Sequence, residues 1–134
     1  MNNINIIKIL ILLVLFPLVD YPYLKLTSNH FKNVVKKISK EDMVFDYKSA
    51  FGAYIFLVIG IYYFVIKDLN DNNIKEQMIK ASILGLSIYG TFDFTNGAIF
   101  KDYDFKTMIM DTIWGGMVFP LVTISFYKVI KFTN

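Results

Sequence analysis

The chain has 134 residues, of which 55% are hydrophobic and 17% aromatic, with a mean hydropathy of +0.47. This composition is too apolar for an ordinary soluble domain, and the length predicts a single domain. The absence of cysteine excludes disulfides and thiolate metal sites, while the net charge of +3, carried by lysine without any arginine, fits a membrane surface and predicts no nucleic-acid partner.

The first apolar segment covers residues 4–26 and is long enough to cross a bilayer as one helix. A secretory signal peptide is the alternative interpretation, but no small-residue cleavage site follows the apolar run, which favours a retained span. Pro17 and Pro22 lie inside this segment and predict a bend, which neighbouring helices can tolerate in a membrane.

Residues 28–40 have the pattern of a basic amphipathic helix. Apolar side chains recur there at helical spacing, and lysines cover much of the remaining surface. The apolar positions are Phe31, Val34, Val35 and Ile38, and the lysines are Lys32, Lys36, Lys37 and Lys40. We expect this helix to lie along an anionic membrane surface, with an ordinary solvated connector as the alternative.

Three further apolar segments follow, at residues 49–66, 81–100 and 107–129, and polar turns separate them. Together with the first segment they predict four membrane spans. The expected fold class is therefore all-α: an integral membrane four-helix bundle with an amphipathic interfacial helix after the first span. Residues 1–134 form one transmembrane domain in this interpretation.

The distribution of lysines predicts the orientation. More of them fall on the side that holds Asp20 and the turn at residues 101–106 than on the side that holds both termini. The positive-inside rule then places both termini outside the cytoplasm, with the opposite orientation as the alternative. The lysines of the first side are Lys25, Lys32, Lys36, Lys37, Lys40, Lys48, Lys101 and Lys106, and those of the other side are Lys8, Lys67, Lys75, Lys80, Lys128 and Lys131.

Three aspartates, Asp20, Asp93 and Asp111, lie inside or near the end of these apolar segments. A carboxylate in a membrane-length apolar run is costly and is therefore a functional-site hypothesis by default. The chain reverses near Tyr103, ten residues after Asp93 and eight residues before Asp111, so antiparallel packing places these two at similar depth. Asp20 lies toward the same side. We predict that the three carboxylates converge in one half of the bundle.

Four residues beside these aspartates, or at helical spacing from them, are candidate lining groups: Tyr89, Thr95, Asn96 and Trp114. Carboxylates crowded in an apolar site cannot all ionise, and a proton held there suits proton-coupled transport or acid–base chemistry. We expect no cofactor, and a divalent cation, Mg²⁺ or Ca²⁺, is the other means of balancing the charge. A zinc site is poorly supported because His30 is the single histidine.

Helix packing alone is a competing explanation, because neighbouring threonine, asparagine and tryptophan side chains can hydrogen-bond these aspartates. We assign no catalytic residue and predict a small multi-pass membrane protein that binds or translocates a small solute, an ion or a lipid headgroup at the aspartates. Its expected partners are membrane lipids and further copies of itself. The alternatives are a membrane-embedded enzyme that uses paired carboxylates on a lipid-linked substrate, and a non-catalytic scaffold or accessory subunit.

Residues 89–96 and 111–115 resemble two motifs of a family of small, mainly bacterial membrane proteins of unknown function with four predicted helices. The family motifs are similar to Tyr-Gly-Thr-Tyr-Asp-Leu-Thr-Asn and Asp-x-x-Trp-Gly, and a first-helix pattern Asp-x-x-Trp-Leu is similar to residues 20–24. This chain departs from them at Phe92, Phe94 and Tyr23, and by the added Pro22. The resemblance implies the architecture and the membrane location, and it implies no activity.

Overall fold

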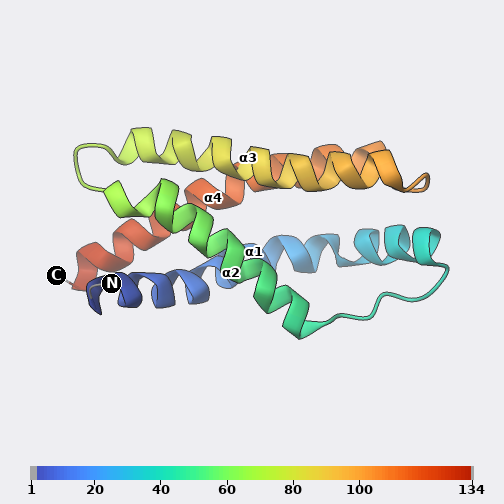
Figure 1. The fold of residues 1–134 in the computed structure, drawn as a ribbon, viewed down its shortest axis with the longest axis horizontal. Coiled ribbons are helices and arrows are strands. Elements are labelled where there is room, and N and C mark those ends of the chain that lie inside the picture. Colours follow the sequence, from blue (N-terminus) through green and yellow to red (C-terminus); the bar gives the residue numbers. More distant parts are fainter. Residues whose placement is uncertain (1–2, 134) are drawn as a thin grey trace.

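The computed structural model describes residues 3–133, with the side chains of residues 6–133, and this part of the chain is helical without any strand. Its elements are α1 (Asn3–Ser39), α2 (Tyr47–Phe64), the short 3-10 helix η1 (Ile66–Asp68), α3 (Ile74–Ile99) and α4 (Phe105–Thr133) (Figure 1). The first and last described residues lie at one end of the bundle, and the α3–α4 turn lies at the other. The predicted all-α fold is confirmed.

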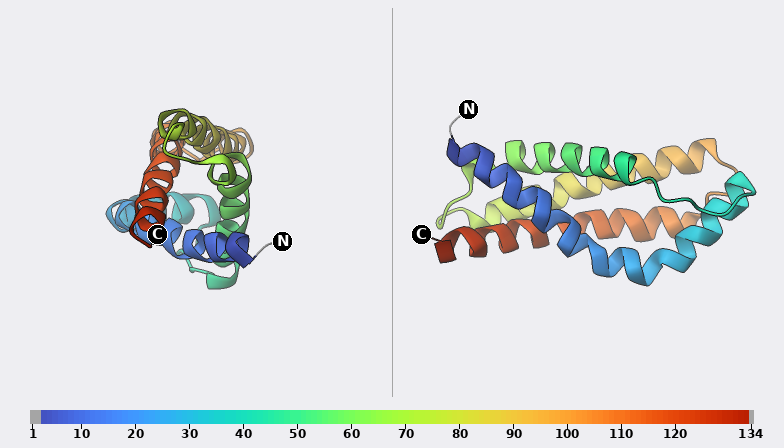
Figure 2. Two further views of the ribbon diagram at one scale, coloured as in Figure 1. Left: turned by 90° about the vertical axis from the view of Figure 1, so that its left-hand side faces the viewer. Right: turned by 90° about the horizontal axis from the view of Figure 1, so that it is seen from below.

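Helix α1 joins the predicted first span and the predicted amphipathic segment into one helix of 37 residues. The amphipathic segment is therefore the C-terminal part of α1 rather than a separate helix, with Val34 buried and the lysines exposed. Figure 2 shows that α1 changes direction along its length. Pro17 and Pro22 each remove a backbone N–H from this helix, which is the usual cause of such a bend.

Three segments of the described chain are long and apolar enough to cross a membrane: most of α1, α2 with η1, and α4. Helix α3 does not reach the same mean hydropathy. Its apolar residues are interrupted by glycine, serine, threonine, asparagine and one aspartate. All three glycines of α3 face α4, and Ser82 hydrogen-bonds it, so these small residues belong to the contact with that helix.

Helices α3 and α4 form a close antiparallel hairpin because glycines, which have no side chain, lie at their interface. A Cβ atom added to Gly85 would lie 1.9 Å from the carbonyl oxygen of Gly115, and one added to Gly115 would lie 2.5 Å from the ring of Tyr89. The hydroxyl of Ser82 donates a 2.7 Å hydrogen bond to the carbonyl oxygen of Gly116. Such contacts drive helix association in lipid, where the hydrophobic effect is absent.

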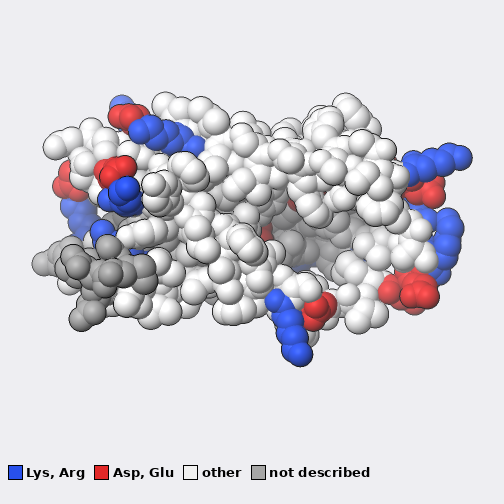
Figure 3. Space-filling model, viewed as in Figure 1, with Lys and Arg blue, Asp and Glu red and all other residues white. Residues whose placement is uncertain are grey.

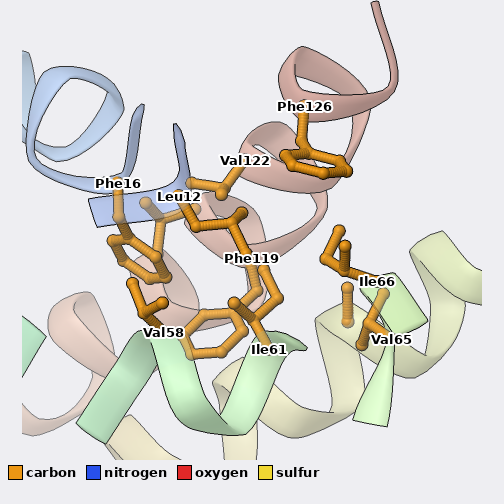
Figure 4. Packing of buried hydrophobic residues seen from close by; sticks show 11 residues of the cluster. Leu12, Phe16, Val58, Ile61, Val65, Ile66, Phe119, Val122 and Phe126 are labelled. Atoms are coloured by element: carbon orange, nitrogen blue, oxygen red, sulfur yellow. The ribbon is translucent and has the colours of Figure 1, made fainter. Parts of the chain in front are cut away.

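The hydrophobic core lies in the half of the bundle that holds the first and last described residues. Figure 4 shows its packing from close by. Phe16 of α1 packs edge-on against Phe119 of α4, with ring centroids 5.1 Å apart. The other buried members are Leu12, Val58, Ile61, Val65, Ile66, Ala81, Val118, Val122 and Phe126. All four long helices contribute to this core, which closes that half of the bundle.

Helix α2 covers only the half that contains the core. Figures 1 and 2 show that it begins near the middle of the bundle, and that residues 40–46 run back to this point from the far end of α1. The Asp46 carboxylate starts α2 by accepting hydrogen bonds from the backbone N–H groups of Lys48 and Ser49. A hydrogen bond from the Ser49 hydroxyl, followed by those from the backbone, holds the pKa of Asp46 below its ordinary value. The other half of the bundle is left without a covering helix.

Candidate functional site

Asp20 of α1 is buried, with 5% of its surface exposed, and both of its carboxylate oxygens accept a hydrogen bond. The Tyr54 hydroxyl of α2 donates to Oδ2 at 2.7 Å, and the Trp114 indole N–H of α4 donates to Oδ1 at 2.7 Å. Hydrogen bonds to an ionised acceptor are stronger than neutral ones, so these donors stabilise a carboxylate held away from water. Asp20 thereby connects three helices.

Asp111 of α4 is half-buried and accepts a 2.8 Å hydrogen bond from the Tyr23 hydroxyl of α1. The Tyr23 ring stacks on the Trp114 ring, with centroids 4.5 Å apart and planes 8° apart. On each helix the aromatic donor follows an aspartate by three residues, Tyr23 after Asp20 and Trp114 after Asp111. The two helices therefore exchange hydrogen bonds, each supplying one carboxylate and one aromatic donor.

Asp93 of α3 is fully buried, and only one of its oxygens has a donor. The Tyr103 hydroxyl, from the α3–α4 turn, donates to Oδ1, whereas Oδ2 accepts no hydrogen bond from the described residues. The carboxyl groups of Asp93 and Asp111 are neighbours, close enough for each to influence the ionisation of the other. Two carboxyl groups can form a hydrogen bond only when a proton lies between them. We call Asp20, Asp93 and Asp111 the acidic cluster.

The α3–α4 turn fixes the donor to Asp93. Burial, and then the hydrogen bond to Asp93, raise the pKa of Tyr103 above its ordinary value, so its phenol remains a donor at physiological pH. Asp104 caps α4 by accepting hydrogen bonds from the backbone N–H of Thr107 at 2.8 Å and from its hydroxyl at 3.0 Å. Because that hydroxyl proton is already used, the His30 Nε2 atom, 2.7 Å away, acts as donor to the hydroxyl oxygen. This contact joins α1 to the turn.

No ion pair in the part of the chain that the structure describes includes a member of the acidic cluster. The four ion pairs all join exposed side chains: Lys36–Asp42, Lys40–Asp102, Lys80–Glu76 and Lys131–Asp71. Among residues 6–133, no three His, Asp or Glu side chains lie close enough together to form a metal centre. Neutral hydroxyl and indole donors therefore stabilise the carboxyl groups of the cluster, and no basic side chain of the described residues balances their charge.

A cleft of about 320 Å³ opens beside the acidic cluster, and we call it the acidic cleft. Its walls come from the C-terminal half of α1, from the 40–46 connection and from the α3–α4 hairpin, where α2 provides no cover. Figure 3 shows a hollow on this face with acidic side-chain atoms visible inside it. The residues that line the cleft and matter for its chemistry are Asp20, Tyr23, Phe31, Tyr89, Asp111 and Trp114.

The structure brings together five of the residues singled out in the sequence: Asp20, Tyr89, Asp93, Asp111 and Trp114. Asn96 lies at the margin of this group, beside the Tyr103 hydroxyl. Thr95 is exposed and lies outside the group. It follows Asp93 by two residues, a spacing that places it on the opposite face of α3.

Sequence reasoning misses three hydroxyl donors of the site, namely Tyr23, Tyr54 and Tyr103. Tyr23 has a recognisable signal, because it follows Asp20 at the spacing with which Trp114 follows Asp111. Tyr54 lies in an uncharged apolar segment and Tyr103 in a turn, so no local pattern distinguishes either of them. Only the tertiary arrangement of α2 and of the α3–α4 turn brings them to the carboxylates.

Comparison with known proteins agrees with this architecture. The model of a family described as "Predicted membrane protein (DUF2177)" matches residues 5–127, which include every residue of the acidic cluster. No curated protein and no solved structure matches the chain. Together with the three long apolar helices, the family match identifies an integral membrane protein. The chain belongs to the DUF2177 family of predicted membrane proteins.

Proposed function

We propose that this protein binds a positively charged small solute, ion or lipid headgroup at the acidic cluster, and that binding releases a proton shared by Asp93 and Asp111. The observation that carries the proposal is the Oδ2 atom of Asp93, which is buried beside Asp111 without a donor. An unsatisfied polar atom in a membrane interior is costly. A proton or a cation at this position satisfies it.

The sign of the ligand charge follows from the neighbours of the cluster. Asp20, Asp93 and Asp111 accept hydrogen bonds from tyrosine and tryptophan, and no lysine pairs with any of them in the described chain. Three carboxylates that share only neutral donors repel one another. Binding of a cation lowers that repulsion, whereas binding of an anion increases it.

Access to the cluster supports solute binding over a purely structural role. The acidic cleft reaches Asp20 and Asp111 from the half of the bundle that α2 leaves uncovered. Its volume of about 320 Å³ lies in the range of small-molecule sites. The hydrophobic core around Phe16 and Phe119 separates the cluster from the other end of the bundle. In this conformation the core therefore closes the cluster off from the end of the bundle that holds the first and last described residues.

We also propose that α3 crosses the membrane and makes a fourth span. Its outer surface carries large exposed apolar side chains along its length, at Ile79, Ile83, Leu86, Phe92 and Ile99. Four spans would place the first and last described residues on one side of the membrane, and these residues lie at the same end of the bundle (Figure 1). The lysine distribution supports a location of that side outside the cytoplasm. Because a bundle of four helices encloses little volume, we propose a homo-oligomer for any transport.

The test is the thermal unfolding midpoint of the purified protein in detergent, measured across pH with Na⁺, Mg²⁺, Ca²⁺ or n-butylammonium. A ligand that binds only the folded state raises the midpoint. We expect one of these cations to raise it most at high pH, where protons compete least, and we expect Asp93→Asn and Asp111→Asn to abolish the effect. Asp102→Asn is the matched control, because Asp102 is an exposed aspartate in the α3–α4 turn.

Two outcomes would contradict the proposal. If no cation changes the midpoint and the three variants differ only in stability, the aspartates serve helix packing. If Mg²⁺ or Ca²⁺ alone acts, and does so without displacing protons, the membrane-embedded enzyme with paired carboxylates becomes the better interpretation.

A further inference from the structure

A second cleft, of about 350 Å³, opens between α2 and α3 and shares two side chains with the acidic cleft. The shared residues are Tyr89 and Asp111. The rest of its lining is apolar: Ala53, Phe56, Leu57, Ile88 and Phe92. Phe56 and Phe92 are 76% and 61% exposed, on an outer surface that faces lipid in a membrane. We call this opening the lateral cleft.

The two clefts differ in the chemistry that they can accommodate. The acidic cleft offers the carboxylates of Asp20 and Asp111 and the stacked rings of Tyr23 and Trp114, which together attract a cationic group. The lateral cleft offers only apolar surface apart from the two shared residues. Neither cleft is lined by lysine or histidine, so a phosphate or carboxylate group would find no basic partner there.

We propose that the ligand is an amphiphilic amine, whose ammonium group binds Asp111 and Asp20 while its alkyl chain lies in the lateral cleft. This inference rests on the proposed function and names the substrate class of the same site. Burial of the chain between Phe56 and Phe92 adds apolar affinity. The arriving ammonium group replaces the proton shared by Asp93 and Asp111, so the net charge of the site is unchanged.

The lining also decides between two sources of such an amine. An amine-bearing phospholipid carries a phosphate close to its ammonium group, and that phosphate would lie among Asp20, Asp111 and aromatic rings without a counter-charge. A single-chain amine has no such group. The geometry therefore favours a free alkylamine.

Trp114 provides a reporter for this binding because it is the single tryptophan of the chain and lines the acidic cleft. Its indole N–H is bonded to Asp20, so an ammonium group at that carboxylate changes the environment of the ring. The experiment uses the full chain in phosphatidylcholine nanodiscs, and the emission of Trp114 is followed during titration. The probes are dodecylammonium, n-butylammonium, dodecanol and dodecyl sulfate.

We expect dodecylammonium to change the emission saturably, and we expect dodecanol and dodecyl sulfate to produce no saturable change. Asp111→Asn is expected to abolish the response. This variant should still fold, because an asparagine oxygen can accept the Tyr23 hydrogen bond. Nanodiscs that contain phosphatidylethanolamine test the second source, and an emission change with this lipid alone would overturn the assignment of a single-chain amine.

Ala53→Phe fills the lateral cleft at an exposed position of α2 and isolates the role of the chain. We expect it to weaken dodecylammonium binding about tenfold, since losing burial of two methylene groups has roughly that effect. n-Butylammonium binding should be unchanged. Ala98→Phe is the matched control, because Ala98 is an exposed alanine of α3 outside both clefts, and it should alter neither affinity.

The outcomes separate this inference from the proposed function. If Ala53→Phe leaves both affinities unchanged or weakens both equally, the chain does not occupy the lateral cleft and the inference fails, while aspartate-dependent binding of n-butylammonium would still support the proposed function. If no amine acts but Na⁺ raises the unfolding midpoint through Asp93, the amine class is wrong and the proposed function again stands. If no cation acts through the aspartates, both fail.

Discussion

Tyr23 of α1 and Trp114 of α4 stack face to face, and each donates its hydrogen bond to an aspartate of the other helix. Tyr23 donates to Asp111, and Trp114 donates to Asp20. On both antiparallel helices the aromatic residue follows the aspartate by three positions. The pair therefore has an approximate local two-fold relation. Because the stack and the hydrogen bonds use different parts of the rings, a substitution can remove one without the other.

Tyr23→Phe retains the stacked ring and removes the hydrogen bond to Asp111. We expect a loss of about 1 kcal/mol in the free energy of unfolding, the usual size for a hydrogen bond between membrane helices. Denaturant unfolding of the detergent-solubilised protein measures it. Tyr21→Phe is the control, since Tyr21 is 61% exposed and should be insensitive to loss of its hydroxyl. If Tyr23→Phe and Tyr21→Phe change the free energy of unfolding equally, the hydrogen bond from the Tyr23 hydroxyl adds nothing to stability.

Gly115→Ala should destabilise the α3–α4 hairpin, because the new methyl group would lie 2.6 Å from the backbone oxygen of Gly85 and 2.5 Å from the Tyr89 ring. Overpacking of this kind costs roughly 1–3 kcal/mol, and more where backbone must move. Gly52→Ala is the matched control within α2, where an added Cβ meets nothing within 4 Å. We expect that control to be neutral or slightly stabilising. Thermal unfolding of both variants measures this difference. A Gly115→Ala variant as stable as the Gly52→Ala control would mean that the α3–α4 hairpin is packed less closely than the structure shows.

The helices could be predicted from the sequence because each contains a long apolar run, but their ends depend on local contacts. Helix α2 begins at Tyr47, two residues before the predicted span, because the Asp46 side chain caps it. An aspartate at this place is a helix-start signal that the sequence contains. The continuity of α1 through residue 39 could not be read locally. It depends on burial of Val34 and on the contact between His30 and Thr107, which only the folded hairpin provides.

The aspartates of the candidate site could be predicted from the sequence, because burying a charge in an apolar segment is costly. That cost selects Asp20, Asp93 and Asp111 without knowledge of the fold. Their partners are a different matter, because Tyr54 and Tyr103 reach the carboxylates from a helix and a turn that carry no periodic polar signal. The direction of Thr95 away from the cluster follows from helical spacing and could have been anticipated.

Asp104 should make a pH-dependent contribution to the stability of α4. Burial alone would raise the pKa of Asp104, but hydrogen bonds from Thr107 outweigh burial and hold the pKa below its ordinary value. The stabilisation is therefore complete above the unfolded pKa of about 3.9 and is lost as pH falls through the lower folded value. Asp104→Ala should cost about 1 kcal/mol at neutral pH.

The Asp104→Ala penalty should shrink in acid, as measured by unfolding of both proteins across that pH range. Asp104→Asn separates the cap from its charge, because asparagine is also a good N-cap residue but does not titrate. We expect that variant to remain close to the wild type at neutral pH and to lose less stability in acid. A penalty for Asp104→Ala that stays constant down to low pH would show that the cap does not depend on the ionised carboxylate.

Substitution of asparagine for aspartate should have opposite effects at two members of the acidic cluster. In Asp93→Asn the amide N–H can donate to the adjoining Asp111, and the remaining oxygen can still accept from Tyr103. The conflict between two carboxyl groups is removed, so we expect this variant to be about 1 kcal/mol more stable than the wild type at neutral pH. The same substitution should remove cation binding, because the site loses the negative charge that appears when the shared proton leaves.

Asp20→Asn is the matched comparison, because Asp20 already accepts one hydrogen bond at each oxygen. An amide group can accept at one oxygen only and carries no charge, so either Tyr54 or Trp114 loses its acceptor while the other keeps a neutral one. We expect a loss of about 1 kcal/mol. Unfolding of the two variants at neutral pH measures both changes. Stabilisation at Asp93 combined with loss of binding is the signature of a functional site, where an unsatisfied group is kept at the expense of stability. Equal destabilisation by both substitutions would instead mean that Asp93, like Asp20, serves to hold the helices together.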